Sequence, residues 1–98
     1  KNLTTIKRGA FSECSGITKF NVVSTKLNSM GKYALYRTGK LKTVIFKTGY
    51  LTKSNVGSKA FSGIKSTATF TVPAGSVQNY KDLFKSKGAG SKFKVKSL

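Results

Sequence analysis

The stretch Ala10-Phe11-Ser12-Glu13-Cys14-Ser15-Gly16-Ile17-Thr18-Lys19-Phe20 decides the fold, because its pattern recurs along the chain. A large apolar residue, three other positions, Ala and then Phe or Leu occur at residues 6–11, 30–35 and 56–61. The second copy therefore begins 24 positions after the first (30 − 6), and the third 26 positions after the second (56 − 30). Recurrence at a nearly fixed period of this length is typical of repeat architectures. We therefore interpret the chain as a repeat protein of about three units.

The second half of each unit predicts a short strand. Three apolar positions, separated by two residues and then by one, follow at residues 17–22, 41–46 and 67–72, with Thr67 as the one lapse. The end of this pattern alternates with period two and is rich in β-branched residues, as short half-buried strands are. A unit with one short strand cannot enclose a core, so the units are expected to stack with their strands parallel.

Stacking predicts columns of equivalent side chains. The two expected apolar columns consist of Phe11, Leu35 and Phe61, and of Phe20, Val44 and Phe70. The small residues Ala10, Ala34 and Ala60 are expected in a tight helical turn that approaches its neighbour closely. Gly31 and Gly57 are expected to adopt backbone with φ above zero, which glycine tolerates.

The last quarter of the chain has a different pattern. Pro73 interrupts the repeat, and Ser76 is expected to cap a helix over residues 76–87 that Gly88 and Gly90 end. The apolar residues of this helix form one stripe: Val77, Tyr80, Leu83 and Phe84. Residues 92–96 alternate strictly and predict a final strand, with Phe93 and Val95 inward and Lys outward as on a protected sheet edge. Residues 73–98 are therefore expected to cap the last repeat.

The quoted stretch is close to the unit apolar-Gly-x-x-Ala-Phe-x-x-Cys-x-x-Leu-x-x-Ile-x-apolar, and over about residues 3–72 the chain resembles the BspA-like leucine-rich repeats. The resemblance makes Cys14 the ladder cysteine, with Thr38 and Ile64 as departures from it in the next two units. It implies a β-rich α+β fold. The expected fold is a leucine-rich-repeat solenoid of about three 24–26-residue units with short parallel strands, closed by a C-terminal helix and strand. Residues 1–98 would form a single domain, with repeats over 1–72 and the cap over 73–98.

Composition excludes most catalytic chemistry. Nineteen Lys and Arg stand against two acids, giving a formal charge of +17, and the chain has no His and one Cys. It therefore lacks the residues for most acid–base catalysis, for Cys–His nucleophilic chemistry and for a zinc site, so we expect no enzyme and assign no catalytic, cofactor-binding or metal-binding residue. No apolar run approaches about 18 residues, so no membrane span is expected. Cys14 cannot form an intrachain disulfide and is expected to be a small buried residue.

The charge leaves two interpretations of the partners open. Seventeen of the cations are Lys, dispersed along the chain, whereas nucleic-acid readers favour Arg clusters. Tyr33, Tyr36 and Tyr50 are the only candidates for exposed rings and form no pair at strand spacing, so nucleic acid is the least favoured partner. The lysines either keep a β-rich surface soluble or attract an acidic protein or an anionic surface polymer.

Outward positions on the three predicted strands form the candidate ligand face: Lys19, Asn21, Thr43, Ile45, Lys47, Thr69 and Thr71. The alternative is a solvated sheet that uses Thr for β-propensity. The resemblance implies a non-enzymatic module that is secreted or on the bacterial cell surface and mediates protein interaction or adhesion. The chain is expected to be the C-terminal piece of a longer protein, because it begins in mid-unit. Two other functions remain open, a purely structural cap and a generic polyanion binder that takes wall polymer, glycosaminoglycan or nucleic acid.

Overall fold

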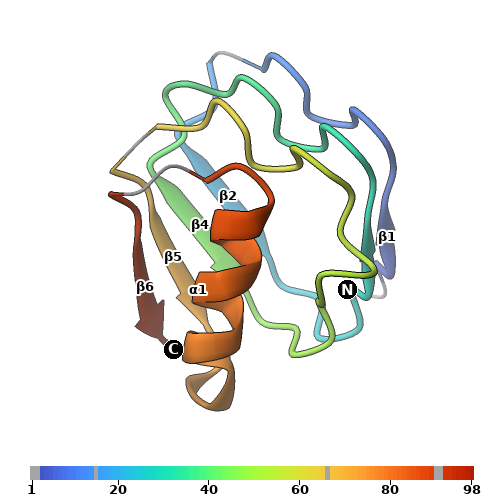
Figure 1. Ribbon diagram of the computed structural model, residues 1–98, viewed down its shortest axis with the longest axis vertical. Coiled ribbons are helices and arrows are strands. Elements are labelled where there is room, and N and C mark those ends of the chain that lie inside the picture. The colour runs from blue at the N-terminus through green and yellow to red at the C-terminus, as the bar shows by residue number, and fades with distance from the viewer. Residues whose placement is uncertain (1–2, 15, 66, 90–91) are drawn as a thin grey trace.

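The computed structural model describes residues 3–14, 16–65, 67–89 and 92–98, and the chain passes repeatedly through two parallel sheets (Figure 1). The smaller sheet pairs β1 (Thr5–Ile6) with β3 (Ser29–Met30), and a single parallel bridge joins Met30 to Val56. The larger sheet contains β2 (Lys19–Val22), β4 (Thr43–Phe46), β5 (Thr69–Val72) and β6 (Lys94–Ser97) in that order. Between β5 and β6 the chain forms the 3-10 turn η1 (Ala74–Ser76) and the helix α1 (Val77–Ser86).

The strand register confirms the predicted period. Phe20 pairs with Val44, and Val44 pairs with Phe70, so partners in β2, β4 and β5 are the residues that the repeat pattern makes equivalent. Phe70 in turn pairs with Val95 of β6, which continues the same register at nearly the same period. Each predicted six-residue strand is observed over its last four residues, and β6 begins two residues later than predicted. Short parallel strands and one C-terminal helix are thus the observed elements.

The turns that precede the strands in successive repeats are also joined to one another by backbone hydrogen bonds. The N–H groups of Gly9, Phe11 and Glu13 donate to carbonyls of the turn at residues 32–36, over 2.7–2.9 Å. The N–H of Leu35 donates in the same way to Ala60 O at 2.8 Å. Phe11, Leu35 and Phe61 therefore lie in successive neighbouring turns, as the predicted column requires.

The expected helical turn around the alanines is instead a run of tight turns. Each of these turns has two residues with left-handed backbone, four positions apart: Gly9 and Glu13, Tyr33 and Arg37, and Lys59 and Gly63. Left-handed residues cannot continue a right-handed helix, so no helix forms there. Ala34 and Ala60 are fully buried, as a close approach requires, whereas Ala10 in the first repeat is exposed.

The prediction of positive φ at Gly31 and Gly57 was wrong. The positive-φ glycines among the described residues are Gly9, Gly63 and Gly88. A Cβ on Gly31 would lie 2.2 Å from the backbone N of Arg8, and one on Gly57 would lie 2.3 Å from the backbone N of Lys32. Glycine is required here because the neighbouring repeat passes too close for any side chain.

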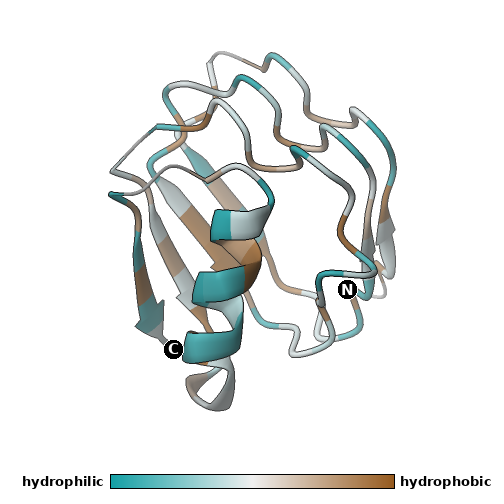
Figure 2. Cartoon of the chain, in the orientation of Figure 1, coloured by the Kyte–Doolittle hydropathy of each residue, from teal (hydrophilic) through white to brown (hydrophobic). Residues whose placement is uncertain are grey.

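Two buried aromatic residues join the helix to the repeats. Phe84 stacks on Phe70 with ring centroids 3.9 Å apart and contacts Phe61 edge to face at 5.1 Å. Together with Tyr80 and Leu83 it forms the buried side of α1, while Val77 is half-buried. Figure 2 shows hydrophobic residues along the strands beside a largely hydrophilic α1. The helix therefore packs its apolar stripe on the same core as the strands.

The helix boundaries differ slightly from the prediction of residues 76–87. Ser76 makes no side-chain capping hydrogen bond, because the chain enters α1 through η1, where the N–H of Ser76 donates to Pro73 O at 2.9 Å. Gly88 has a φ of +100° just after the helix, as predicted for a terminating glycine. Gly90, the second predicted terminator, lies outside the described residues.

A column of buried hydroxyl groups joins consecutive repeats and was not predicted. Ser24 Oγ donates to Leu3 O at 2.7 Å, and Thr48 Oγ1, at the equivalent position of the next repeat, donates to Leu27 O at 2.6 Å. Beyond Thr48 the pattern changes, because the phenol of Tyr80 donates to Thr48 O and accepts from Leu51 N. The helix is thus hydrogen-bonded to the loop after β4 by bonds of its own.

The longer spacing before the third repeat has a local cause. Ile6 follows Leu3, and Met30 follows Leu27, by three positions, whereas Val56 follows Leu51 by five. The additional residues form a turn in which Asn55 Oδ1 accepts from Thr52 N at 2.7 Å and Asn55 Nδ2 donates to Tyr50 O at 2.8 Å. The insertion is absorbed there and leaves the strand register intact.

The lapse at Thr67 is a shift by one position. Thr67 is exposed, and Ala68 is fully buried instead. The N–H of Ala68 donates to Lys65 O at 3.0 Å, as the N–H of Leu41 donates to Thr38 O at 2.9 Å in the preceding repeat. Ala68 therefore takes the place of Leu41, one position after the lapse that the sequence pattern has at Thr67.

Candidate functional site

The outward side of the four-stranded sheet brings most of the predicted face residues together. We define the outer sheet face as two rows that cross the strands in register: Lys19, Thr43, Thr69 and Lys94, and Asn21, Ile45, Thr71 and Lys96. Six of the seven predicted residues lie in these rows, and none of the six is buried. Lys47, the seventh, is exposed directly after β4.

Two residues of this face were missed because they lie in the predicted cap. Lys94 pairs with Thr69 and Lys96 with Thr71 in β6. The strict alternation at residues 92–96 places these lysines outward, and their distance along the chain from β5, close to the repeat period, was the available signal. What could not be foreseen is that a helix between the strands leaves the register unchanged.

Charge on the outer sheet face lies at its edges. Lys19 of β2 and Lys94 of β6 end the first row, with two threonines between them. Parallel strands lie about 4.8 Å apart, so these two lysines are separated by about 14 Å across the sheet. Neither row contains an acidic residue. The face offers hydroxyl groups and the half-buried Ile45 at its centre and cations at its rim.

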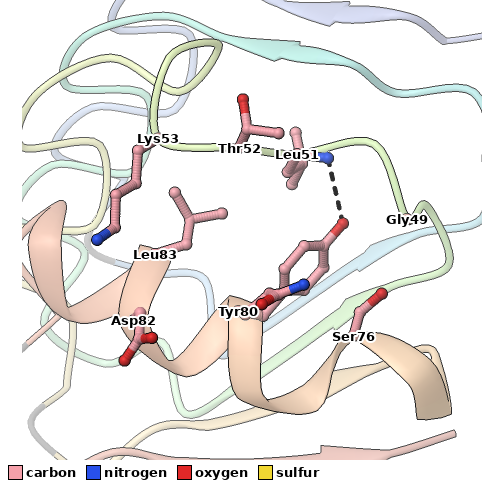
Figure 3. Close-up of a pocket in the computed structure, with 9 residues that line it drawn as sticks. Gly49, Leu51, Thr52, Lys53, Ser76, Tyr80, Asp82 and Leu83 are labelled. Carbon is pink, nitrogen blue, oxygen red and sulfur yellow. Dashed lines mark hydrogen bonds between the residues drawn. The ribbon is translucent and has the colours of Figure 1, made fainter.

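A second candidate site is a pocket of 320 Å³ between α1 and the loop after β4 (Figure 3). Its lining includes Thr52, Lys53, Asn79 and Asp82. The ring of Tyr80 points from α1 toward the loop, where its hydroxyl accepts from Leu51 N at 3.2 Å (Figure 3). The same hydroxyl donates to Thr48 O at 2.6 Å. Because both hydrogen bonds are made to the backbone, this phenol holds the helix in place.

Burial of Tyr80 keeps its hydroxyl protonated. Removal from water raises the pKa of the phenol above its ordinary value of 10.0, and the hydrogen bond with Leu51 opposes this effect to a lesser degree. A neutral phenol with both its hydrogen bonds satisfied is not poised as an acid or a base. In the described part of the chain, no group of three or more His, Cys, Asp or Glu residues could hold a metal ion.

A third cluster lies on the turn side. Tyr33 and Tyr36 pack edge to face with ring centroids 4.9 Å apart, and the guanidinium carbon of Arg8 lies 5.9 Å from the centre of the Tyr33 ring. No signal in the sequence indicates this pair, because its three-residue spacing matches no strand. The hydrogen bond from Gly9 N to Lys32 O is what aligns the turn of Arg8 with that of the tyrosines.

Cys14 is less covered than expected. It is half-buried, whereas Thr38 and Ile64, its counterparts in the next two repeats, are buried. The buried hydroxyl of Thr38 has a hydrogen-bond partner, because it donates to Leu35 O at 2.8 Å. The difference follows from position, because the first repeat has a neighbouring turn on one side only among the described residues.

Within the described residues, α1 is the only α-helix. No helix in that part of the chain is long and apolar enough to cross a membrane.

Comparison with known proteins adds one finding. A family model described as "BspA type Leucine rich repeat region (6 copies)" matches residues 1–97. The match extends beyond the residues 3–72 that carried the resemblance and includes α1 and β6. No curated protein and no solved structure matches the chain.

Proposed function

Since the chain belongs to the BspA-type leucine-rich-repeat region family, we propose that it is a non-enzymatic, secreted or cell-surface module that mediates protein interaction or adhesion. Proteins of this family are generally not enzymes and are typically at the cell surface. The proposal includes a solenoid made by the stacked repeats and a cap made by α1 and β6. Two observations support that arrangement, the unbroken strand register through β6 and the hydrogen bonds by which Tyr80 joins α1 to the loop after β4.

The outer sheet face is the proposed contact surface. The observation that carries this assignment is the pair of rows in which outward residues of four strands lie in register, with Ile45 at the centre. An apolar centre within a polar rim is the usual composition of a protein contact. Lys19, Lys94 and Lys96 at the rim would guide an acidic partner to the face without determining which partner binds.

Adhesion to anionic polymer is the second candidate, and the net charge of +17 favours it. Binding of this kind weakens steeply with salt, because it releases counterions from the polymer. Surface plasmon resonance against heparin, duplex DNA, purified wall polymer and a panel of purified extracellular proteins, each over a salt series, distinguishes the candidates. Saturable, salt-resistant binding to one protein supports the proposed function.

The variant Ile45→Asp is the specific probe of the face. It is expected to weaken binding to such a protein by about tenfold or more, because a central contact residue becomes charged. A matched control is Tyr50→Asp, which adds the same charge at an exposed position on the loop after β4, outside the face. A steep salt slope on every polyanion, with no effect of Ile45→Asp, would replace protein interaction by generic attraction. Absence of binding to every analyte would leave only the structural role.

A further inference from the structure

The turn side carries a compact aromatic and cationic patch whose composition differs from that of the rest of the surface. We define the turn patch as Arg8, Tyr33, Tyr36 and Arg37. It contains both arginines and two of the four tyrosines of the chain. Both arginines are exposed and both tyrosines are half-buried. Tyrosine and arginine are the residue types most enriched at the energetic centres of protein contacts.

Contacts between its own side chains order the patch before any partner binds. The two tyrosines pack against each other at 4.9 Å, and Arg8 lies over Tyr33 at 5.9 Å. A guanidinium that lies against a ring keeps its N–H groups free to bind a carboxylate in a bidentate manner. Arg37 is 4.0 Å from the carboxylate of Glu13, but both side chains are about two-thirds exposed, so a partner's carboxylate can replace Glu13 readily.

Backbone conformation gives an independent reason to assign a role to these side chains. Tyr33 and Arg37 occupy the two left-handed positions of the second turn, with φ of +60° and +57°. The first turn has Gly9 at one of these positions and the third has Gly63 at the other. Glycine is the residue that relieves the strain there, and the second turn alone uses it at neither position. The two residues adopt a backbone conformation that costs energy, as residues at binding sites often do.

From these observations we infer that the turn patch is a second interaction surface and that its partner is an acidic protein segment bearing an aromatic or large apolar side chain. The carboxylates would bind Arg8 and Arg37, and the apolar side chain would pack on the tyrosines. Charge complementarity favours this partner, because the chain has two acids against nineteen cations. The inference concerns a different surface from the outer sheet face and shares with the proposed function only the class of partner.

Single-stranded nucleic acid fits the patch less well. Such ligands stack successive bases on the open faces of rings. Here the two tyrosine planes are inclined by 76°, and Arg8 covers one face of Tyr33. The rings therefore do not offer two parallel platforms at once.

The test uses two synthetic peptides of equal charge, one with repeated Glu-Glu-Phe and one with repeated Glu-Glu-Ser. Binding of each fluorescent peptide is measured by anisotropy at about 150 mM salt, where generic attraction between exposed charges is largely screened. The Phe peptide is expected to bind about tenfold more tightly than the Ser peptide, because it adds a buried side chain at the contact.

Charge-conserving variants separate recognition from net charge. Arg8→Lys and Tyr33→Gly both leave the net charge at +17. Each is expected to lower the affinity for the Phe peptide about tenfold, to the affinity for the Ser peptide. Tyr50→Ser is the matched control, because Tyr50 is 61% exposed and lies outside the patch; it is expected to leave binding unchanged. Tyr33→Gly is also expected to raise the urea midpoint, so that a loss of binding cannot be attributed to unfolding.

Equal affinity for the two peptides, or unchanged binding by both patch variants, would overturn the inference. Tighter binding of a thymidine oligonucleotide than of the Phe peptide, lost in the same variants, would also overturn it in favour of nucleic acid. Ile45→Asp is measured in parallel with the peptides and is expected to bind them normally. Failure at the turn patch and failure at the outer sheet face are therefore distinguishable.

Discussion

The first repeat and the opposite end of the protein, where α1 lies, contain similar side chains that are buried to different extents. Phe11, Ile17 and Phe20 of the first repeat are only partly buried, and Phe11 and Phe20 line an open groove of 230 Å³. At the other end, Phe61, Phe70 and Phe84 are fully buried. The residue types are alike, so the difference arises from what lies next to each repeat. In the proposed solenoid each repeat is buried by its neighbour, and at one end α1 takes the neighbour's place.

Phe84→Ala is expected to have the largest effect on this contrast. The ring contacts three other buried phenylalanines, Phe46, Phe61 and Phe70, and its removal would leave a large cavity. We expect a loss of about 3–5 kcal/mol in the free energy of unfolding, measured by urea denaturation. Phe20→Ala at the first repeat is the matched comparison and should cost clearly less, because that ring is already partly in water. Equal losses would show that the helix end is not the better packed one.

Gly57→Ala tests the close approach between repeats. Its Cβ would lie 2.3 Å from the backbone N of Lys32, so one repeat must move away from the other. The expected destabilisation is about 3 kcal/mol, at the upper end of the cost of overpacking. Gly75→Ala is the control, since nothing lies within 4 Å of a Cβ there, and it should leave the urea midpoint nearly unchanged. A tolerated Gly57→Ala would contradict the observed contact.

Tyr80→Phe removes the hydroxyl that joins the helix to the repeats. Leu51 N and Thr48 O lose their partner, and the expected cost is about 1–3 kcal/mol. The cost should shrink at alkaline pH. The pKa of Tyr80 is raised in the folded state, so the native protein holds a proton that the unfolded chain releases above about pH 10. The stabilisation is therefore complete below pH 10 and is lost as the pH rises further.

The pH series of wild type and Tyr80→Phe together makes this measurable. Lysine titration affects both proteins alike, so it cancels in the difference between their free energies of unfolding. A difference that stays constant or grows above pH 10 would show that the phenol is not buried as described.

Tyr33→Gly is expected to have the smallest effect and the opposite sign. Relief of the left-handed backbone should stabilise the second turn by about 1 kcal/mol, observed as a higher urea midpoint. Tyr36→Gly provides the comparison, because Tyr36 is not among the positive-φ residues and the change should destabilise. Destabilisation by Tyr33→Gly would mean that packing of this ring outweighs the strain.

The period, the strands and the helix could be predicted because each has a local signal in the sequence. Val44 and Phe70 lie one repeat apart, and the alternation around them identifies the buried side of β4 and β5. The same alternation places Thr43 and Thr69 on the outer sheet face. Long-range geometry was not accessible in this way. Nothing local distinguishes a glycine required by positive φ from one required by a neighbouring backbone, so Gly31 was misinterpreted.

The hydroxyl column and the turn patch were missed for a related reason. The hydroxyl groups of Ser24 and Thr48 reach their carbonyl partners only when the repeats are stacked, and Tyr80 reaches Thr48 O from a helix that has no repeat spacing. Arg8 and Tyr33 are distant along the chain and meet because the turns are bonded to one another. Both features come from the arrangement of repeats in space.

Native-state hydrogen exchange tests the central claim, that each repeat is stabilised by the one beside it, most directly. Amide protection reports the free energy of local opening, residue by residue. The account predicts a gradient, with the slowest exchange in β4, β5 and α1 and progressively faster exchange toward β1 and β2. Uniform protection of all strands, or slower exchange in β2 than in β5, would contradict it.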